Sequence, residues 1–173
     1  MKQIGLLSSV NKIELMIYIR WKEERNMTAQ QMWHQFARET GISAEYDAWA
    51  FCGGGEIGDR LAKLVLDGIK TATASAYISY QIENESIPKA GSYSVVLYDS
   101  GEAACIIQTN KVNLVPFDEV SAQHAYKEGE GDKSLVYWRE VHREAFTPDY
   151  AAAGLEFDEH GLIVLEEFTV VYR

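Results

Sequence analysis

The stretch Gly68-Ile69-Lys70-Thr71-Ala72-Thr73 decides how this chain of 173 residues is interpreted. It follows a segment, residues 57–66, whose apolar residues recur at helical spacing, and Gly68 suits the left-handed position just after a helix. Beyond it, residues 71–80 are rich in Thr, Ala and Tyr, and the sequence takes on the character of a strand. The stretch is therefore predicted to bend where a helix gives way to a strand.

Turn and cap residues divide the rest of the chain into further helices and strands. Thr28 is predicted to cap a helix that Gly41 ends. Asp99-Ser100-Gly101 is predicted to form the turn of a hairpin between two apolar strands. The predicted elements are helices at 28–41, 57–66, about 116–126 and 134–145, and strands at 71–80, 93–98, 103–115 and 162–171. This order indicates an α+β domain and not a repeated β-α-β sheet.

Two of these helices have a predicted inner face, which follows from the spacing of their apolar residues. The side chains expected to be buried are Ile57, Leu61, Leu64 and Val65 in the first, and Leu135, Trp138 and Val141 or His142 in the second.

The composition fits one globular domain, with 47% hydrophobic and 24% charged residues. We expect residues 27–173 to form this domain and residues 1–26 to be an N-terminal extension of undefined structure. Sixteen Lys and Arg against 26 Asp and Glu give a formal charge of -10. This balance repels a phosphate backbone, so extended DNA binding is not expected, whereas a local pocket for one nucleoside or nucleotide is compatible with it.

The two cysteines, Cys52 and Cys105, lie in neither a CxxC nor a metal-ligand spacing. We therefore expect a reduced, cytoplasmic protein with no disulfide framework, zinc site or cofactor. The apolar residues near the start are interrupted by Asn11, Lys12 and Glu14, so neither a signal peptide nor a membrane span is expected, and no membrane partner.

The segment Gly53-Gly54-Gly55-Glu56-Ile57-Gly58 matches the GxGxxG pattern of dinucleotide sites. That fingerprint requires a buried strand before it and a second, parallel strand that carries an acidic residue. Here the preceding apolar segment, residues 48–51, is short, and the later strands form hairpins. The glycines are therefore interpreted as a loop that feeds a helix, whose N-terminus can still meet an anion.

Lys70 and Thr73 have two interpretations from their residue types alone. A lysine that loses its proton can activate a threonine hydroxyl as a nucleophile. Alternatively, the lysine complements the dipole of a helix end and the threonine starts a strand. Because positions three apart on a straight strand face opposite sides, cooperation between the two side chains requires the bend at Gly68. Spacing alone favours the structural interpretation.

Several other segments occur in order around this stretch. They are Ala48-Trp49-Ala50-Phe51, residues 61–75, Val115-Pro116-Phe117-Asp118-Glu119-Val120, Glu128-Gly129-Glu130-Gly131-Asp132 and Trp138-Arg139-Glu140-Val141-His142. Together with the GxKxxT pattern of residues 68–73, this set resembles the longer bacterial branch of the ASCH domain family, over roughly residues 33–173. The resemblance implies a small, mostly antiparallel PUA-like β-barrel flanked by helices, and an association with RNA and its modified nucleosides.

Some proteins of that family are amidohydrolases that remove an acyl group from the exocyclic nitrogen of cytidine, with a lysine, a threonine and a glutamate. The resemblance places these roles on Lys70, Thr73 and Glu128. As a neutral base near pH 7, Lys70 would need a pKa lowered by about 3 units, which a nearby Glu128 opposes. Lys70 can instead act charged and polarise the carbonyl, while Glu128 orients groups or shuttles a proton. Ser75 stands where the short enzymes of this kind have an arginine, which leaves the substrate open.

Aromatic and polar side chains near these residues are candidates to hold the ligand, because bases stack on aromatic rings. Core packing is the alternative for the aromatic residues, and a salt bridge on a helix face is the alternative for Arg139 and His142. The predicted substrate-binding residues are Thr71, Ser75, Tyr77, Trp49, Arg139 and His142. A metal cluster of Glu128, Glu130, Asp132 and His124 is a weaker alternative, and no metal is predicted.

Three functions are compatible with these residues. The first is an amidohydrolase acting on an N-acylated (deoxy)cytidine or a similar small amide. The second is a non-catalytic module that binds RNA or a modified nucleotide, and the third is a metal-independent ribonuclease. The acidic composition favours a small nucleoside or nucleotide ligand over long RNA contacts.

Overall fold

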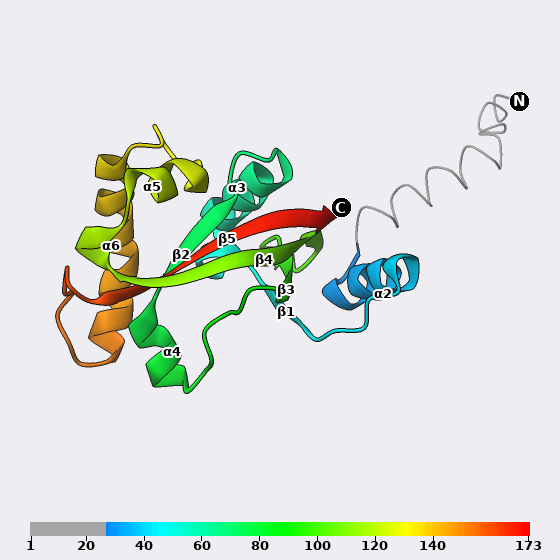
Figure 1. The fold of residues 1–173 in the computed structure, drawn as a ribbon, viewed down its shortest axis with the longest axis horizontal. Coiled ribbons are helices and arrows are strands. Elements are labelled where there is room, and N and C mark those ends of the chain that lie inside the picture. The colour runs from blue at the N-terminus through cyan, green and yellow to red at the C-terminus, as the bar shows by residue number, and fades with distance from the viewer. Residues whose placement is uncertain (1–26) are drawn as a thin grey trace, which may run out of the picture.

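The computed structural model describes residues 27–173, so the predicted extension, residues 1–26, lies outside the described residues. Helices and strands alternate irregularly along the chain (Figure 1). The helices are α2 (Ala29–Thr40), α3 (Gly55–Leu66), α4 (Tyr77–Glu83), α5 (Ala122–Glu128) and α6 (Leu135–Ala152), with 3-10 turns at Phe51–Gly53 and Phe117–Glu119. The strands are β1 (Tyr46–Trp49), β2 (Ala72–Ala76), β3 (Tyr93–Leu97), β4 (Ala103–Pro116) and β5 (Leu162–Tyr172).

The five strands form one sheet in the order β1-β3-β4-β5-β2. The pairs β3-β4, β4-β5 and β5-β2 are antiparallel, and β1 runs parallel to β3. This confirms the predicted α+β class and the hairpin turned by Asp99-Ser100-Gly101. The expected barrel is not closed, however, because β1 and β2 are the two edges of the sheet and do not pair with each other. These edge strands have only 4 and 5 residues, and each finds a single neighbour.

Helix α2 begins and ends at the residues that the sequence predicts. Thr28 accepts a hydrogen bond from the backbone N–H of Gln31, and the Gln31 side chain accepts one from the backbone N–H of Thr28, which completes a capping box. Gly41 ends the helix with a left-handed φ of 74°. The helix and the strands beneath it share one apolar cluster, formed by Met32, Trp33, Phe36, Val95, Ala103 and Ile106.

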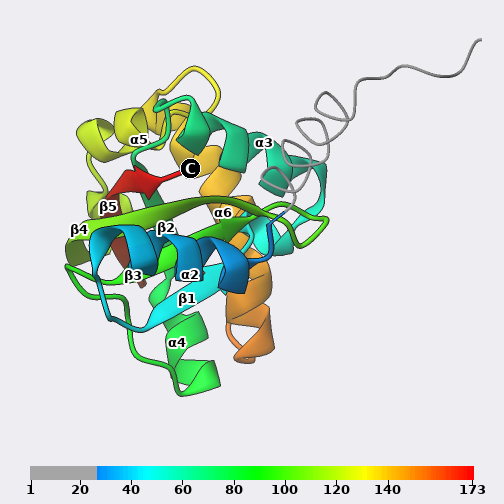
Figure 2. The same cartoon turned by 90° about the vertical axis from the view of Figure 1, so that its right-hand side faces the viewer.

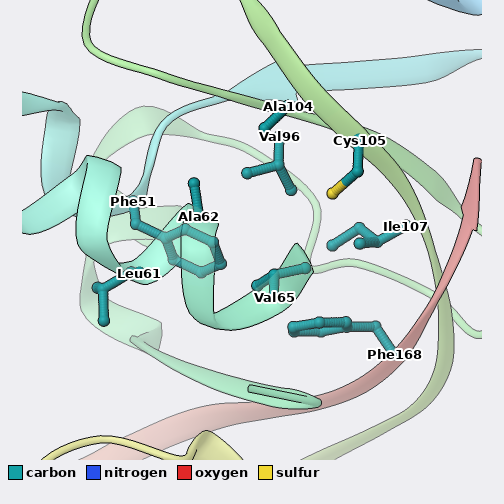
Figure 3. Packing of buried hydrophobic residues seen from close by; sticks show 9 residues of the cluster. All are labelled: Phe51, Leu61, Ala62, Val65, Val96, Ala104, Cys105, Ile107 and Phe168. Atoms are coloured by element: carbon teal, nitrogen blue, oxygen red, sulfur yellow. The ribbon is translucent and has the colours of Figure 1, made fainter. Parts of the chain in front are cut away.

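Helix α3 packs on the face of β3 and β4 opposite to α2, because Val95 and Val96 point to opposite faces and join different clusters. The cluster under α3 contains Phe51, Leu61, Ala62, Val65, Val96, Ala104, Cys105, Ile107 and Phe168 (Figure 3). Ile57, predicted to be buried, is 54% exposed. The inner position of this first turn belongs instead to Gly58, where a Cβ would lie 2.5 Å from the carbonyl oxygen of Phe51.

Helices α5 and α6 gather at the end of the molecule opposite to α2, as the two perpendicular views show (Figures 1 and 2). They pack on β2 and the start of β5. Their buried cluster consists of Ala76, Phe117, Val120, Ala125, Trp138, Phe146, Tyr150, Ile163 and Leu165. On the inner face of α6 the buried residue is His142, one of the two predicted alternatives, and not Val141.

The predicted strand at 71–80 ends early. Its last residue, Ala76, pairs with Ile163, which lies at the start of β5. Beyond that pair β2 has no strand to bond with, and residues 77–83 form helix α4 instead. Strand length here depends on the partner strand and not on local composition.

Two predicted helix boundaries also move. The segment expected to be helical from residue 116 opens with a 3-10 turn, and α5 begins only after Ser121, whose hydroxyl accepts a hydrogen bond from the backbone N–H of His124. Helix α6 runs past residue 145 and through Pro148 to Ala152. None of the helices within residues 27–173 is both long and apolar enough to cross a membrane.

Candidate active site

The predicted bend after α3 is a helix C-cap in which Gly68 has a left-handed φ of 70°. The N–H of Gly68 donates to the carbonyl of Val65 at 3.0 Å, and that of Ile69 to the carbonyl of Leu64 at 2.9 Å, the pattern of a Schellman motif. The N–H of Lys70 donates to the same Leu64 carbonyl at 3.0 Å. Lys70 is thus held by the helix end before β2 begins, and its side chain is buried, with 1% exposed.

The end of α5 is bound directly to this bend. The backbone N–H of Thr71 donates to the carbonyl of Lys127 at 2.8 Å, and its hydroxyl donates to the same oxygen at 3.3 Å. Gly129 packs so closely that a Cβ there would lie 2.5 Å from the carbonyl oxygen of Ile69. The last residue of α5, Glu128, is therefore carried to the side chain of Lys70.

Lys70 forms a buried ion pair with two carboxylates. Its Nζ lies 2.7 Å from Oε2 of Glu128 and 2.7 Å from Oε1 of Glu130. Glu128 is buried, with 1% exposed, whereas the Glu130 side chain is 18% exposed and reaches solvent. The ring of Phe51 lies under the ammonium, 5.3 Å from Nζ to its centroid. A lysine ammonium has three N–H donors, so these two bonds leave one donor over.

The second oxygen of Glu128 faces side chains of α5 and α6. The indole Nε1 of Trp138 donates to Oε1 at 2.6 Å. The Nε2 atoms of His124 and His142 lie 3.2 Å and 3.6 Å from the same oxygen, and neither contact is a hydrogen bond. Nδ1 of His142 lies 2.9 Å from the backbone carbonyl of Trp138. Glu128 is therefore fixed from two sides and has little freedom to move.

The charges of this cluster follow from its contacts. Burial alone would lower the pKa of Lys70, but Glu128 and Glu130 raise it above its ordinary value of 10.5. Burial also opposes ionisation of Glu128, but Lys70 and the imidazoles of His124 and His142 hold its pKa well below 4.5. Lys70 is thus an ammonium at neutral pH, which is the opposite of what a general base needs. Of the two predicted states of Lys70, neutral and charged, the structure favours the charged one.

Thr73 lies at the junction of two adjoining compartments of one cleft. The smaller compartment, of about 650 Å³, is lined by Thr73 together with Lys70, Glu128 and Glu130. The larger, of about 770 Å³, is lined by residues of both edge strands, β1 and β2. The residues common to both are Phe51, Cys52, Thr73, Ala74 and Ser75. The sheet is therefore left open where the cleft lies.

The sequence of this site and its fold both have known counterparts. Residues 47–172 match the family model of the ASCH domain. The chain belongs to the ASCH domain family. This ASCH domain is similar to the crystal structure of an ASCH domain from Lactobacillus crispatus JV V101, with 35% identity, a TM-score of 0.78, and 87% of this chain and 96% of that chain covered. A protein from Enterococcus faecalis V583 is 36% identical, with a TM-score of 0.74 and coverage of 82% and 86%. No curated protein matched the chain.

Three of the six predicted substrate-binding residues line the cleft of this ASCH domain. Trp49 lines the larger compartment, His142 the smaller, and Ser75 both. The hydroxyl of Ser75 lies 2.9 Å from that of Tyr80, which also lines the larger compartment. Ser75, the position without the arginine, therefore presents a neutral pair of hydroxyls to the cleft.

The other three predicted residues lie outside both compartments. Thr71 is bonded to the backbone at the end of α5. Tyr77 is the first residue of α4. Arg139 donates from Nη2 to the carbonyl of Asp118 at 2.8 Å and so ties α6 to the turn before α5. These contacts support the frame of the site.

Glu130 and Glu166 are two of the cleft carboxylates of this ASCH domain that are not among the residues predicted for catalysis. Glu130 is considered above only as a metal ligand, and it binds Lys70 instead. Glu166 is buried and lines the larger compartment. The sequence feature that could have indicated Glu166 is the pair Glu166-Glu167 within a mostly apolar strand. Successive side chains of a strand point to opposite faces, so one of two neighbouring glutamates must face inward.

The glycine-rich loop before α3 feeds a helix, as predicted, and Gly53, Gly54 and Gly55 all have positive φ. The backbone N–H of Gly55 donates to Oδ1 of Asp99 at 2.7 Å. The anion at this helix N-terminus is therefore a carboxylate of the ASCH domain itself, supplied by the hairpin turn between β3 and β4.

The carboxylates at and after the end of α5 bind Lys70 or the backbone. Glu128 and Glu130 bind Lys70, and Asp132 accepts a hydrogen bond from the backbone N–H of Ser134 at 2.8 Å. Within the described range, residues 27–173, no three His, Cys, Asp or Glu side chains are arranged to hold a metal ion. The weaker alternative of a metal cluster at this place thus has no support from the geometry.

Proposed function

We propose that this ASCH domain protein is an amidohydrolase for a small, nucleoside-sized amide, with N-acylated cytidine or deoxycytidine as the substrate class to test first. The observation that carries the proposal is the position of Thr73, which borders one compartment with Lys70 and Glu128 and a second compartment beyond it. Ligand pockets usually span about 300–1,000 Å³. The compartments, of about 650 and 770 Å³, give room for a nucleoside and its acyl group around one hydroxyl.

Thr73 has the hydroxyl that suits a nucleophile. The hydroxyls of its neighbours Thr71 and Ser75 are engaged with the Lys127 carbonyl and the Tyr80 hydroxyl. The Thr73 hydroxyl, by contrast, has no hydrogen-bond partner among residues 27–173. It is therefore free to attack an acyl carbon, forming an ester on Thr73 that water then hydrolyses.

Lys70 supplies positive charge for the developing oxyanion. Two of its N–H groups are held by Glu128 and Glu130, which fixes the direction of the remaining one. A fixed, charged donor in a buried setting stabilises an oxyanion more than a mobile one in water does. Glu128 acts here as a positioning residue, because its own oxygens are engaged with Lys70 and Trp138.

The charges that line the cleft support a small ligand over RNA. The larger compartment has three carboxylates and one lysine, contributed by Asp47, Glu85, Glu166 and Lys89. The smaller has four carboxylates and two cations, contributed by Glu128, Glu130, Glu144, Asp149, Arg60 and Lys70. An excess of negative charge repels phosphates. This favours a neutral nucleoside over the alternatives of RNA binding and ribonuclease action.

The test is hydrolysis of N4-acetylcytidine, N4-acetyl-2′-deoxycytidine and their longer acyl homologues by the full chain, with release of the free nucleoside followed by chromatography. We expect turnover of at least one of these compounds. Thr73→Ala should lower kcat/KM by about 10³-fold or more, and Thr73→Ser should retain part of the activity. Thr169→Ala is the matched control, since Thr169 is exposed on β5 and lines neither compartment.

Intact substrates after incubation, in an assay where a known amidohydrolase turns them over, would rule out this substrate class. Salt-sensitive binding of structured RNA without turnover, lost in Lys70→Ala, would instead identify a binding module. Cleavage of RNA in the presence of a chelator would identify a ribonuclease.

A further inference from the structure

Glu166 lies directly across the sheet from the proposed nucleophile. In the antiparallel pair of β2 and β5, Thr73 is the partner of Glu166. Side chains of such partners leave the same face of the sheet, with Cβ atoms about 4.5–5.5 Å apart. Both residues line the larger compartment. Glu166 is therefore a cross-strand neighbour of Thr73 and lines the compartment that Lys70 does not line.

The carboxylate of Glu166 is buried but sparsely bonded. The residue is 9% exposed, and Oε2 accepts one hydrogen bond, from the hydroxyl of Thr109 at 3.1 Å. Among residues 27–173 it has no ion pair and no other hydrogen bond. Buried carboxylates are normally paired or fully hydrogen-bonded. A buried carboxylate that has one neutral donor and lines a cleft is suited to bind a donor that the ligand supplies.

We propose that Glu166 is the general base and general acid of the amide hydrolysis, a role that rests on the function proposed above. As Thr73 Oγ1 bonds to the acyl carbon, the Glu166 carboxylate takes the hydroxyl proton. As the C–N bond breaks, Glu166 returns that proton to the leaving nitrogen, giving the free amine and an ester on Thr73. Glu166 then takes a proton from water as it attacks the ester and returns it to Thr73 Oγ1, which releases the carboxylic acid.

The other ionisable groups near Thr73 are less suited to this proton transfer. Lys70 is already protonated, and the Glu128 oxygens are held by Lys70 and Trp138. Burial raises the pKa of Glu166, opposed by the Thr109 hydrogen bond and assisted by the charge of Asp47. A carboxylate with a pKa moved toward neutrality is a better base and, once protonated, still a competent acid.

The groups around Glu166 come from four elements. Thr109 on β4 bonds to it, Thr73 and Ser75 on β2 face it, and the carboxylate of Asp47 on β1 and the phenol of Tyr80 on α4 share its compartment. Glu85 and Lys89, from the segment after α4, complete the charged lining. Asp47 is the group whose charge adds to the upward shift of the Glu166 pKa.

The experiment measures activation of Thr73 without reference to the natural substrate. The full chain is treated with p-nitrophenyl acetate, and acetylation of the peptide that contains Thr73 is followed by mass spectrometry across a pH series. We expect the rate to rise with pH as Glu166 ionises. Glu166→Gln should lower it by about 10²-fold and remove the rise with pH. Asp47→Asn should move the midpoint to lower pH, because it removes a negative charge beside Glu166.

The matched control is Glu167→Gln, since Glu167 is the adjacent carboxylate, binds Lys127 and Lys111, and lies outside both compartments. In this variant, Thr73 should be acetylated at the same rate as in the wild type. The melting temperature of each variant shows whether it is folded, and Glu166→Asp provides a second carboxylate variant, expected to keep the rise with pH at a lower rate.

Equal labelling of Thr73 in the wild type and in Glu166→Gln overturns the role of Glu166, and so does a wild type that is not labelled at Thr73. Neither outcome depends on nucleoside turnover. Labelling that requires Glu166, in a protein that leaves every acyl nucleoside intact, supports Glu166 and rejects only the substrate class of the proposed function.

Discussion

Replacing Lys70 by Met should destabilise the protein by about 3–5 kcal/mol, because it leaves a buried carboxylate without its cation. Glu128 is 1% exposed and its Oε2 lies 2.7 Å from the lysine Nζ, so removal of the ammonium leaves this carboxylate without a counter-charge. Met keeps most of the apolar stem, which separates the effect of charge from that of a cavity. In a domain of this size the loss corresponds to a melting temperature lower by roughly 10 °C or more.

The assay is urea unfolding followed by tryptophan fluorescence, with Lys63→Met as the control, since Lys63 is exposed on α3. The double variant Lys70→Met, Glu128→Gln removes both charges and should recover about 2 kcal/mol of the loss. In Lys70→Met alone, burial is left to raise the pKa of Glu128, so its stability should fall as the pH rises. A loss below about 1 kcal/mol, or no recovery in the double variant, would refute the argument that Lys70 and Glu128 are a buried, charged pair.

Two further predictions concern the stability of two variants, Gly129→Ala beside the site and Glu166→Gln within it. Gly129→Ala should lose roughly 2–4 kcal/mol in chemical denaturation, because its φ is 73° and the added Cβ would meet the Ile69 carbonyl at 2.5 Å. Gly41→Ala, with a φ of 74° and open space around the Cβ, should lose only the backbone part; equal losses would contradict the close approach. Because burial raises the folded-state pKa of Glu166 above its value in the unfolded chain, its contribution to stability declines as pH rises through that window. Glu166→Gln should therefore melt higher than the wild type near pH 8 and about equally near pH 4, and a variant that melts lower near pH 8 would count against this.

Features that depend on a few neighbouring residues could be predicted from the sequence. Thr28 and Gly41 bound α2 because a cap is decided by the residues at the helix end. Gly68 marks the bend for the same reason, and the bend is what allows Lys70 and Thr73 to border one compartment. The place of Glu128 beside Lys70 came from the family resemblance, since the two residues are 58 positions apart.

Features that depend on tertiary pairing could not be predicted in this way. The end of β2 at Ala76 is decided by where β5 begins, and the open sheet by two edge strands that find one neighbour each. The carboxylate of Asp99 at the start of α3 belongs to a hairpin 44 positions away. Glu166 becomes a candidate only when the register of β2 against β5 places it opposite Thr73.

The docking of α5 on the bend at Gly68 has a consequence for how the native state forms and persists. The contacts that complete the cleft join residues 58 and 57 positions apart, Lys70 with Glu128 and Thr109 with Glu166. Such contacts follow the closure of long loops, after the caps and the hairpin have formed locally. We expect the ion cluster to assemble on the native side of the folding barrier. The strength of the ion cluster should then determine the unfolding rate and have little influence on the folding rate.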